Sequence, residues 1–238
     1  MKEVDGLRWG RSNVRESKPV AAVPIDVVEA TLPFAPAPVA AMTRLQLLSG
    51  CRPGEVMRMR AIDLNMSGPV WEYRPAYHKN KHRGLDRVIF LGVQAQDVIR
   101  PFLKTDLHAF LFSPRECVEA LHAHRTQLRK TRRTPSEQRR RRKPAPKRKP
   151  AERYNRRSYR VAIVRAVDKA NQERAKRGLQ PLPHWSPLQL RHTAATSIRS
   201  KYGVEAARVI LGHSKVETTQ IYAERDLARA AQIVAEIG

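Results

Sequence analysis

The chain has 238 residues, enough for one large domain or two small ones, and its 46 Lys and Arg against 22 Asp and Glu give a formal net charge of +24 at pH 7. This surplus favours a polyanionic partner, nucleic acid first. The sequence has neither the apolar run of 18 residues expected of a membrane span nor the apolar leader expected of a secreted protein. The two cysteines, Cys51 and Cys117, form no disulfide-like or metal-like pattern, which is typical of the cytoplasm, where we expect the protein to act.

The N-terminal part of the chain is expected to be helical after a polar start. Residues 1–37 are interpreted as a tail or linker, in which Asp26 caps a short helix. A longer amphipathic helix is predicted over residues 38–49, and Gly50 ends it. Pro53 suits the first turn of the helix that follows.

Alternating residues then predict a small sheet. Residues 70–92 are expected to form two or three short antiparallel strands, the last of them in DRVIFL, residues 86–91. Residues 93–103 predict a helix, and another is expected to end near residue 128 after the short apolar piece HAFLFSP. The sheet is therefore expected to be small and surrounded by helices.

The composition changes sharply after residue 128. Residues 129–160 contain 16 Lys and Arg but only two acidic residues. The segment has several prolines and no apolar period, so we expect a disordered or extended basic insertion over about residues 129–155. Charge of one sign at this density favours a polyanion as partner. The densest run is Arg139, Arg140, Arg141, Arg142 and Lys143.

The C-terminal part again predicts helices. One is expected over residues 158–177, a second ends at Gly203, a third ends at Gly212, and an Ala-rich helix begins near residue 224. The face of the first that we expect to be buried carries Val161, Val164, Ala166 and Val167. The sequence thus predicts a mostly α fold with a small antiparallel β-sheet (α+β).

Several chemically versatile residues occur where structure is expected to change. Arg52 precedes a helix start, Lys79 lies in the hairpin region, Arg191 lies on a helix that opens after a proline, and His213 and Tyr222 follow a glycine stop. Each alone is ordinarily a solvated cation, a helix cap or a packing residue. Together they are what phosphodiester cleavage without a metal requires: guanidinium groups for the phosphate, a proton donor, and a tyrosine whose phenolate cations favour.

Three segments carry a family resemblance. GCRPGEV, LQLRHTAAT and LGHSKVETTQIY resemble the three boxes of the tyrosine recombinase, or phage integrase, family, over about residues 38–226. The resemblance implies an integrase-type catalytic domain over residues 38–238. It also implies that double-stranded DNA is cut and rejoined through a covalent 3′-phosphotyrosine, with no metal or nucleotide cofactor.

The resemblance assigns a role to each residue of the set. Tyr222 matches the nucleophile, and Arg52 and Arg191 match the arginines that clamp the phosphate. His213 matches the histidine that helps to hold the phosphate and the tyrosine. Lys79 matches the hairpin lysine that protonates the 5′ leaving oxygen.

Neighbouring residues complete the expected site. Lys81, two residues after Lys79 on the same strand face, is an alternative proton donor, and Lys81 and Arg83 are further DNA-binding candidates. Glu55 matches the acidic residue that follows the first arginine. We expect Glu55 to orient a helix or an arginine and to take no part in the reaction.

The second box departs from the family pattern His-x-x-Arg because Leu188 stands three residues before Arg191. Leucine donates no hydrogen bond, and losing one such donor typically lowers the rate on the order of 10²-fold. His192 points about 100° away around the helix, and His184 would have to reach in from the preceding loop. The alternative function is therefore an inactive DNA-binding relative of a recombinase.

Length is the second departure, because family members carry an N-terminal DNA-binding domain for which residues 1–37 are too short. The basic insertion would supply part of the missing contact with DNA. A generic RNA-binding role is disfavoured, since six Tyr, five Phe and three Trp offer few stacking platforms. The last helix either docks on a neighbouring protomer, as in family tetramers on paired sites, or packs on its own domain; its apolar face carries Leu227, Ala230, Ala231, Val234 and Ile237.

Overall fold

The computed structural model describes residues 20–78, 86–132, 134–139, 149–212, 232 and 234–237. The helices are α1 Ile25–Thr31, α2 Ala37–Ser49, α3 Pro53–Val56, α4 Val93–Ile99, α5 Pro114–Gln127, α6 Pro135–Arg139, α7 Arg156–Lys176 and α8 Pro187–Leu211. Short 3₁₀ helices lie at Leu32–Phe34, Ala61–Asp63 and Arg100–Phe102, and the strands are β1 Leu64–Asn65, β2 Trp71–Tyr73 and β3 Ile89–Leu91. The mostly α fold with a small antiparallel sheet is confirmed.

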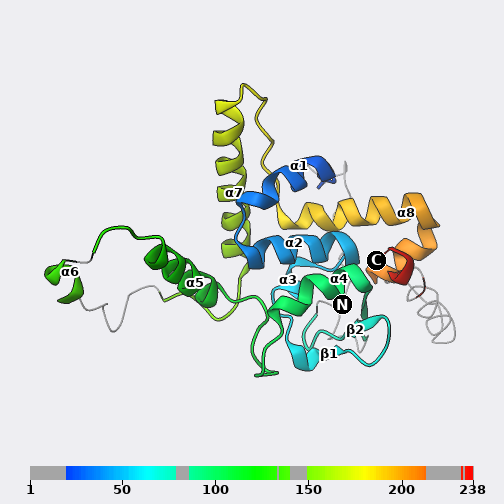
Figure 1. Ribbon diagram of the computed structural model, residues 1–238. Helices are drawn as coiled ribbons and strands as arrows, with labels where there is room; N and C mark the ends of the chain where they lie inside the picture. The colour runs from blue at the N-terminus through cyan, green and yellow to red at the C-terminus, as the bar shows by residue number, and fades with distance from the viewer. Residues whose placement is uncertain are drawn as a thin grey trace, which may run out of the picture.

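Helix α2 is the central element of the molecule. It packs against α8 on one side and against α4 on the other, while α7 stands across its N-terminal end (Figure 1). The predicted apolar residues Val39, Met42 and Leu45 are fully buried. Thr43 and Gln46 are buried as well, so α2 is covered on most of its circumference, as expected of a helix inside a core.

The sheet has three strands in the order β1-β2-β3, all antiparallel. Trp71 faces Leu91 and Tyr73 faces Ile89 across the β2–β3 pair. Only β2 and β3 fall within the segment predicted to form strands, because β1 lies before it. The Tyr73 hydroxyl donates to the backbone oxygen of Glu55 at 2.8 Å and so ties the sheet to α3.

The predicted buried face of α7 is confirmed at Ala166 and Val167 and wrong at Val161 and Val164. Val161 is 37% exposed and Val164 is only half-buried. The buried residues follow the helical period from a tyrosine that the predicted face does not include; they are Tyr159, Ile163, Ala166, Val167 and Ala170. Tyr159 occupies the inward position because its hydroxyl finds buried polar partners on α2.

The interpretation of residues 1–37 as a tail or linker is wrong for residues 23–34. Val27 and Val28 of α1 are buried in the main core, and the Val23 N–H donates to Thr193 Oγ1 of α8 at 2.9 Å. Asp26 is also not the helix cap: Pro24 holds that position and Asp26 lies in the first turn. This segment is an integral layer over α7 and α8.

Helix α8 contains the two helices that the sequence predicted, joined end to end. Gly203, with φ 87° and ψ 173°, breaks the helical path inside it, and Gly212 ends it in a left-handed conformation with φ 61°. The part of α8 that follows Gly203 buries Ile210 and Leu211 in a second apolar cluster. Val234, from the described part of the C-terminal segment, lies in this same cluster, so that part packs on its own domain.

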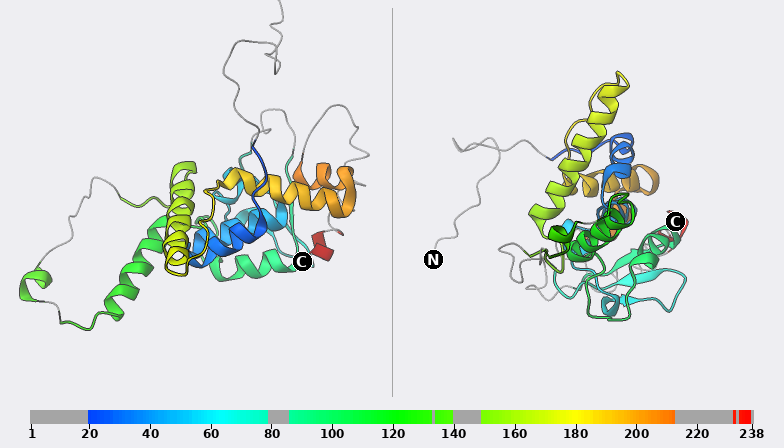
Figure 2. Two further views of the ribbon diagram at one scale, coloured as in Figure 1. Left: turned by 90° about the horizontal axis from the view of Figure 1, so that it is seen from above. Right: turned by 60° about the vertical axis from the view of Figure 1, so that its left-hand side comes forward.

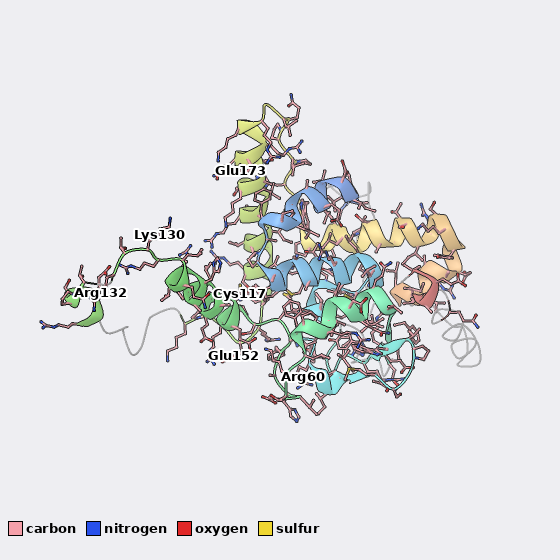
Figure 3. The ribbon with its side chains drawn as sticks, viewed as in Figure 1. Arg60, Cys117, Lys130, Arg132, Glu152 and Glu173 are labelled. Carbon is pink, nitrogen blue, oxygen red and sulfur yellow. The ribbon has the colours of Figure 1, made fainter. Side chains whose placement is uncertain are left out.

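Helices α5 and α6 project from the body of the molecule (Figures 1 and 2). We call residues 114–152 the arm; its residues 133 and 140–148 lie outside the described residues. In α5, which the structure describes in full, no residue is buried. Lys130 and Arg132 lie on the outer part of the arm (Figure 3). The expectation that the basic insertion lacks regular structure is wrong for α6, where Pro135 opens a short helix and Glu137 pairs with Arg129.

No helix in the described part of the chain is long and apolar enough to cross a membrane.

Candidate functional site

Arg52 and Arg191, which are far apart in the sequence, belong to one site in the fold. Arg191 Nη1 donates to the backbone oxygen of Gly50 at 2.7 Å, two residues before Arg52. Arg191 Nη2 donates to the backbone oxygen of Leu211 at 2.6 Å. The guanidinium of Arg191 therefore joins the loop that carries Arg52 to the C-terminal end of α8, where it satisfies a carbonyl that the helix leaves without a partner.

Glu55 fixes Arg52 in place. One carboxylate oxygen of Glu55 accepts the Arg52 backbone N–H at 2.7 Å, and the other accepts Arg52 Nη1 at 3.0 Å. The Glu55 side chain is buried, whereas that of Arg52 is 26% exposed. The expectation that Glu55 orients an arginine is confirmed by these two contacts, and they leave part of the Arg52 guanidinium open to a ligand.

A buried amide holds the two arginine-bearing segments together. Gln46 Nε2 donates to the backbone oxygens of Cys51 and Pro187, each at 3.2 Å. Cys51 directly precedes Arg52, and Pro187 opens the helix that carries Arg191. Gln46 Oε1 accepts the hydroxyl of Tyr159 at 2.9 Å, so α7 supports the arrangement from behind.

The site concentrates positive charge away from water. The pKa of Arg191 is lowered to about 10, first by burial and then by the charges of Arg52 and Arg87, while Glu55 opposes the shift. Burial also lowers the pKa of Arg87. Three guanidinium groups thus share one carboxylate, and a bound anion would relieve their mutual repulsion. Phosphate suits this arrangement because guanidinium groups bind its oxygens bidentately.

Arg87 was not singled out from the sequence, although it lies in the segment DRVIFL. Its side chain is only 7% exposed, Nη1 donates to the backbone oxygen of Ile210 at 3.1 Å, and Nε lies 3.8 Å from Glu55 Oε1. The available signal was its place in the sequence: Arg87 stands two residues before a strand whose three residues, Ile89, Phe90 and Leu91, are all buried. An arginine buried beside such a strand must find buried partners.

Leu188, at the position where the family pattern has histidine, lies on α8 one turn before Arg191 and is 39% exposed. His192 is exposed. His184 Nε2 lies 3.5 Å from an oxygen of Asp168 on α7, so the ring of His184 is directed to that helix. Neither histidine contacts Arg191 through any hydrogen bond described for this part of the chain.

The remaining predicted site residues lie outside the described residues, with one exception. Arg139 is described, exposed at the end of α6. The others are Lys79, Lys81, Arg83, Arg140, Arg141, Arg142, Lys143, His213 and Tyr222. The described stretch 149–212 ends next to one of them, because Gly212 directly precedes His213. Within the described residues, no group of three or more His, Cys, Asp or Glu side chains is placed to hold a metal ion.

Comparison with known proteins identifies the same family as the motifs. A model of the phage integrase family matches residues 26–229. The fold is similar to that of the Tn1549 transposon integrase solved in complex with circular intermediate DNA, with 16% identity, a TM-score of 0.56, and coverage of 90% of this chain and 68% of that chain. An arginine-to-lysine variant of that integrase with another circular intermediate DNA gives 16% identity, a TM-score of 0.53, and coverage of 90% and 67%.

No curated protein matches the chain by sequence. At 16% identity the two solved structures show the fold alone, and that fold is the one described above. The family model extends from α1 to beyond Tyr222 and thus includes both arginines of the site. The chain therefore belongs to the phage integrase family, the tyrosine recombinases.

Proposed function

We propose that this protein is a site-specific DNA recombinase that breaks and rejoins double-stranded DNA through a covalent 3′-phosphotyrosine on Tyr222. The observation that carries the proposal is the convergence of Arg52 and Arg191 on the loop at Gly50 and the end of α8. Two guanidinium groups with surplus positive charge form a site for one phosphodiester. Family membership supplies the reaction class.

In the proposed reaction, Arg52 and Arg191 bind the non-bridging oxygens of the scissile phosphate and stabilise the negative charge of the transition state. The Tyr222 hydroxyl gives its proton to water as its oxygen attacks phosphorus, and the bond to the 5′ oxygen breaks. Lys79, or Lys81 in its place, gives a proton to that leaving oxygen, and His213 helps to hold the phosphate and the tyrosine. Rejoining reverses these steps, with a 5′ hydroxyl as the attacking group.

Double-stranded DNA is the proposed partner. The net charge of +24 and the exposed basic arm favour a polyanion. The structurally similar Tn1549 integrase was solved with circular intermediate DNA, which supports the same class of ligand here. Assembly of several copies on paired sites is proposed as well, in line with family tetramers.

A nicked duplex that traps the covalent product tests the proposal. We expect the protein to form an adduct that survives denaturing electrophoresis, that forms equally well in EDTA, and that is lost in Tyr222→Phe. Arg52→Lys should also lower adduct formation, because an ammonium cannot replace the fork that binds both Glu55 and phosphate. An adduct that persists in Tyr222→Phe would refute the proposed nucleophile.

The position of Leu188 favours a second candidate function, an inactive DNA-binding relative. Its exposed side chain lies one turn from Arg191 and has no hydrogen-bonding group to offer a phosphate. This candidate predicts salt-sensitive binding of duplex DNA with no adduct. Leu188→His restores the family residue; it should produce or raise adduct formation if Leu188 is the only defect, and an inactive Leu188→His protein would show that further changes silence the enzyme.

A further inference from the structure

Arg87 connects three parts of the site that come from distant points in the chain. It stands just before β3 and reaches the last turn of α8, where Nη1 donates to the Ile210 oxygen. On its other side it lies against the carboxylate of Glu55, which in turn holds Arg52. Arg87 and Arg191 thus bind neighbouring carbonyls at the C-terminal end of α8, where positive charge also complements the helix dipole.

The Arg87 side chain fits against the end of α8 because the residue there, Gly212, has no side chain. Gly212 has φ 61°, and a Cβ built on it would lie 2.5 Å from Arg87 Nη1 and 3.0 Å from Arg87 Cζ. Because Arg87 is buried, it has little space into which to retreat. The helix end and the arginine therefore fit each other closely, at the residue that directly precedes His213.

Arg87 is an expensive residue to bury if its role were packing alone. Its Nε and Nη2 have no hydrogen-bond partner among the described residues. Leaving buried polar groups unpaired destabilises a protein, and charged groups more than neutral ones. An apolar side chain would fill the same place without this penalty, so the placement of a guanidinium needs another reason.

We infer that Arg87 is a positioning residue, which holds the end of α8 and the Glu55–Arg52 pair in one fixed arrangement around the phosphate site. The inference rests on the proposed function, since the arrangement matters for reaction only if Arg52 and His213 act on the same phosphodiester. Arg87 acts through these neighbours and does not itself react. Displacements of about 1 Å at such a site are able to lower a rate by about 10²-fold.

The first test needs no activity. Hydrogen exchange of the backbone amides is compared in wild type, Arg87→Met and Arg87→Lys. Arg74→Met is the matched control, because Arg74 is an exposed arginine that pairs with Glu72 on the same sheet. We expect faster exchange in two remote segments, residues 52–57 and 208–212, in both Arg87 variants, with α7 unchanged. Unchanged exchange in either segment would overturn the inference.

The second test uses the nicked duplex. Arg87→Met and Arg87→Lys should lower the rate of adduct formation on the order of 10²-fold, while the affinity for intact duplex at equal salt stays that of Arg74→Met. Lysine keeps the charge but cannot reach both Ile210 and Glu55, so full activity of Arg87→Lys would reduce the role to charge alone and refute positioning. If Arg87→Met fails to fold, both tests are made with Arg87→Lys and Gly212→Ala. The added methyl group of Gly212→Ala would displace the Arg87 side chain.

The two hypotheses fail separately. A wild-type protein that makes no adduct refutes the proposed function, and the exchange experiment still decides whether Arg87 orders both segments. An active wild type with unaffected Arg87 variants refutes the positioning role alone.

Discussion

Gln46, a buried residue of α2, links the two segments that carry Arg52 and Arg191. Its amide donates to Cys51 and Pro187, which flank the segments that carry Arg52 and Arg191. An amide offers two donors and an acceptor in a fixed plane, so it bridges two backbone oxygens that no apolar side chain would link. The acceptor is satisfied by the hydroxyl of Tyr159, so the group is buried without an unpaired oxygen.

Tyr159→Phe tests this network. The change removes the hydroxyl that Gln46 Oε1 accepts and that lies 3.2 Å from Thr43 Oγ1, and leaves both groups buried. We expect the free energy of unfolding to fall by about 1–3 kcal/mol, measured by urea denaturation. Tyr77→Phe, at an exposed tyrosine, should change it by less than about 0.5 kcal/mol. Equal stabilities of the two variants would contradict the proposed support of Gln46.

The same position illustrates why the buried phenol is no second nucleophile. Burial raises the pKa of Tyr159 well above its usual value of about 10, since the phenolate would lose its hydration. Burial, and then the charge of Glu55, likewise raise the pKa of the Cys51 thiol to about 12. Although Cys51 adjoins Arg52, it is therefore a packing residue that stays protonated at neutral pH.

At the scale of elements, the site depends on how closely the loop after α2 approaches the end of α8. Gly50 has φ 61°, and a Cβ built on it would overlap the side chain of Leu211. Two demands thus fall on one residue: a left-handed backbone and the absence of a side chain. The contact brings the Gly50 carbonyl within reach of Arg191, so the position of Arg191 depends on the geometry of this turn.

Gly50→Ala separates these two demands when it is compared with Gly178→Ala. Gly178 also has a positive φ, 67°, but a Cβ there would meet nothing within 4 Å. We expect Gly178→Ala to lower the free energy of unfolding by about 1 kcal/mol from backbone strain alone. Gly50→Ala should lower it by about 1–3 kcal/mol more, because Leu211 must shift. Urea denaturation of both variants measures the difference, and equal losses would mean that the close approach is unimportant.

Local signals in the sequence predicted the ends of elements well, and long-range contacts explain what they missed. Gly50, Gly178, Gly203 and Gly212 were all expected to end helices, and all four have positive φ. A need for left-handed backbone is visible in the residue itself. The predicted face of α7 was right at Ala166 and Val167 but missed Tyr159, because the burial of Tyr159 depends on its partners on α2, which no local pattern contains.

The candidate site also combines residues with a local sequence signal and a residue that depends on long-range contacts. Arg52, Glu55 and Arg191 were predicted as candidates because they lie in recognisable motifs, and the structure places them close together. Arg87 was missed because its partners, Ile210 and Glu55, are distant in sequence. A charged residue next to a buried strand is the general signal that would have identified it.

The arm leaves the body of the molecule and rejoins it at one place. The Arg115 N–H donates to the backbone oxygen of Ala151 at 3.2 Å, and the Arg115 side chain pairs with Glu152 at 2.5 Å. The two ends of the arm thus meet where it leaves the molecule. No residue of α5 is buried, so α5 contributes nothing to the core. The arm should therefore affect DNA binding separately from folding.

Replacing residues 118–149 with a short Gly/Ser linker tests this separation. Cys117 is retained because it contacts Tyr154, and the linker joins ends that already lie close together. We expect the free energy of unfolding to change by less than about 1 kcal/mol, whereas the affinity for duplex DNA should fall. The slope of log K against log salt should also become shallower, by about 0.9 for every phosphate that the arm binds in the wild type.

A second variant distinguishes the charge of the arm from its presence. Arg139, Arg140, Arg141, Arg142 and Lys143 are changed to Gln while the arm is kept. If the arm binds phosphates, this variant should reproduce part of the change in salt slope. Both variants should form the adduct at normal rates once DNA is saturating, because Arg52 directly precedes α3 and Arg191 lies on α8, both outside the arm. A salt slope equal to that of the wild type in the linker variant would show that the arm binds no phosphates and that the charge needed for DNA binding lies on the body.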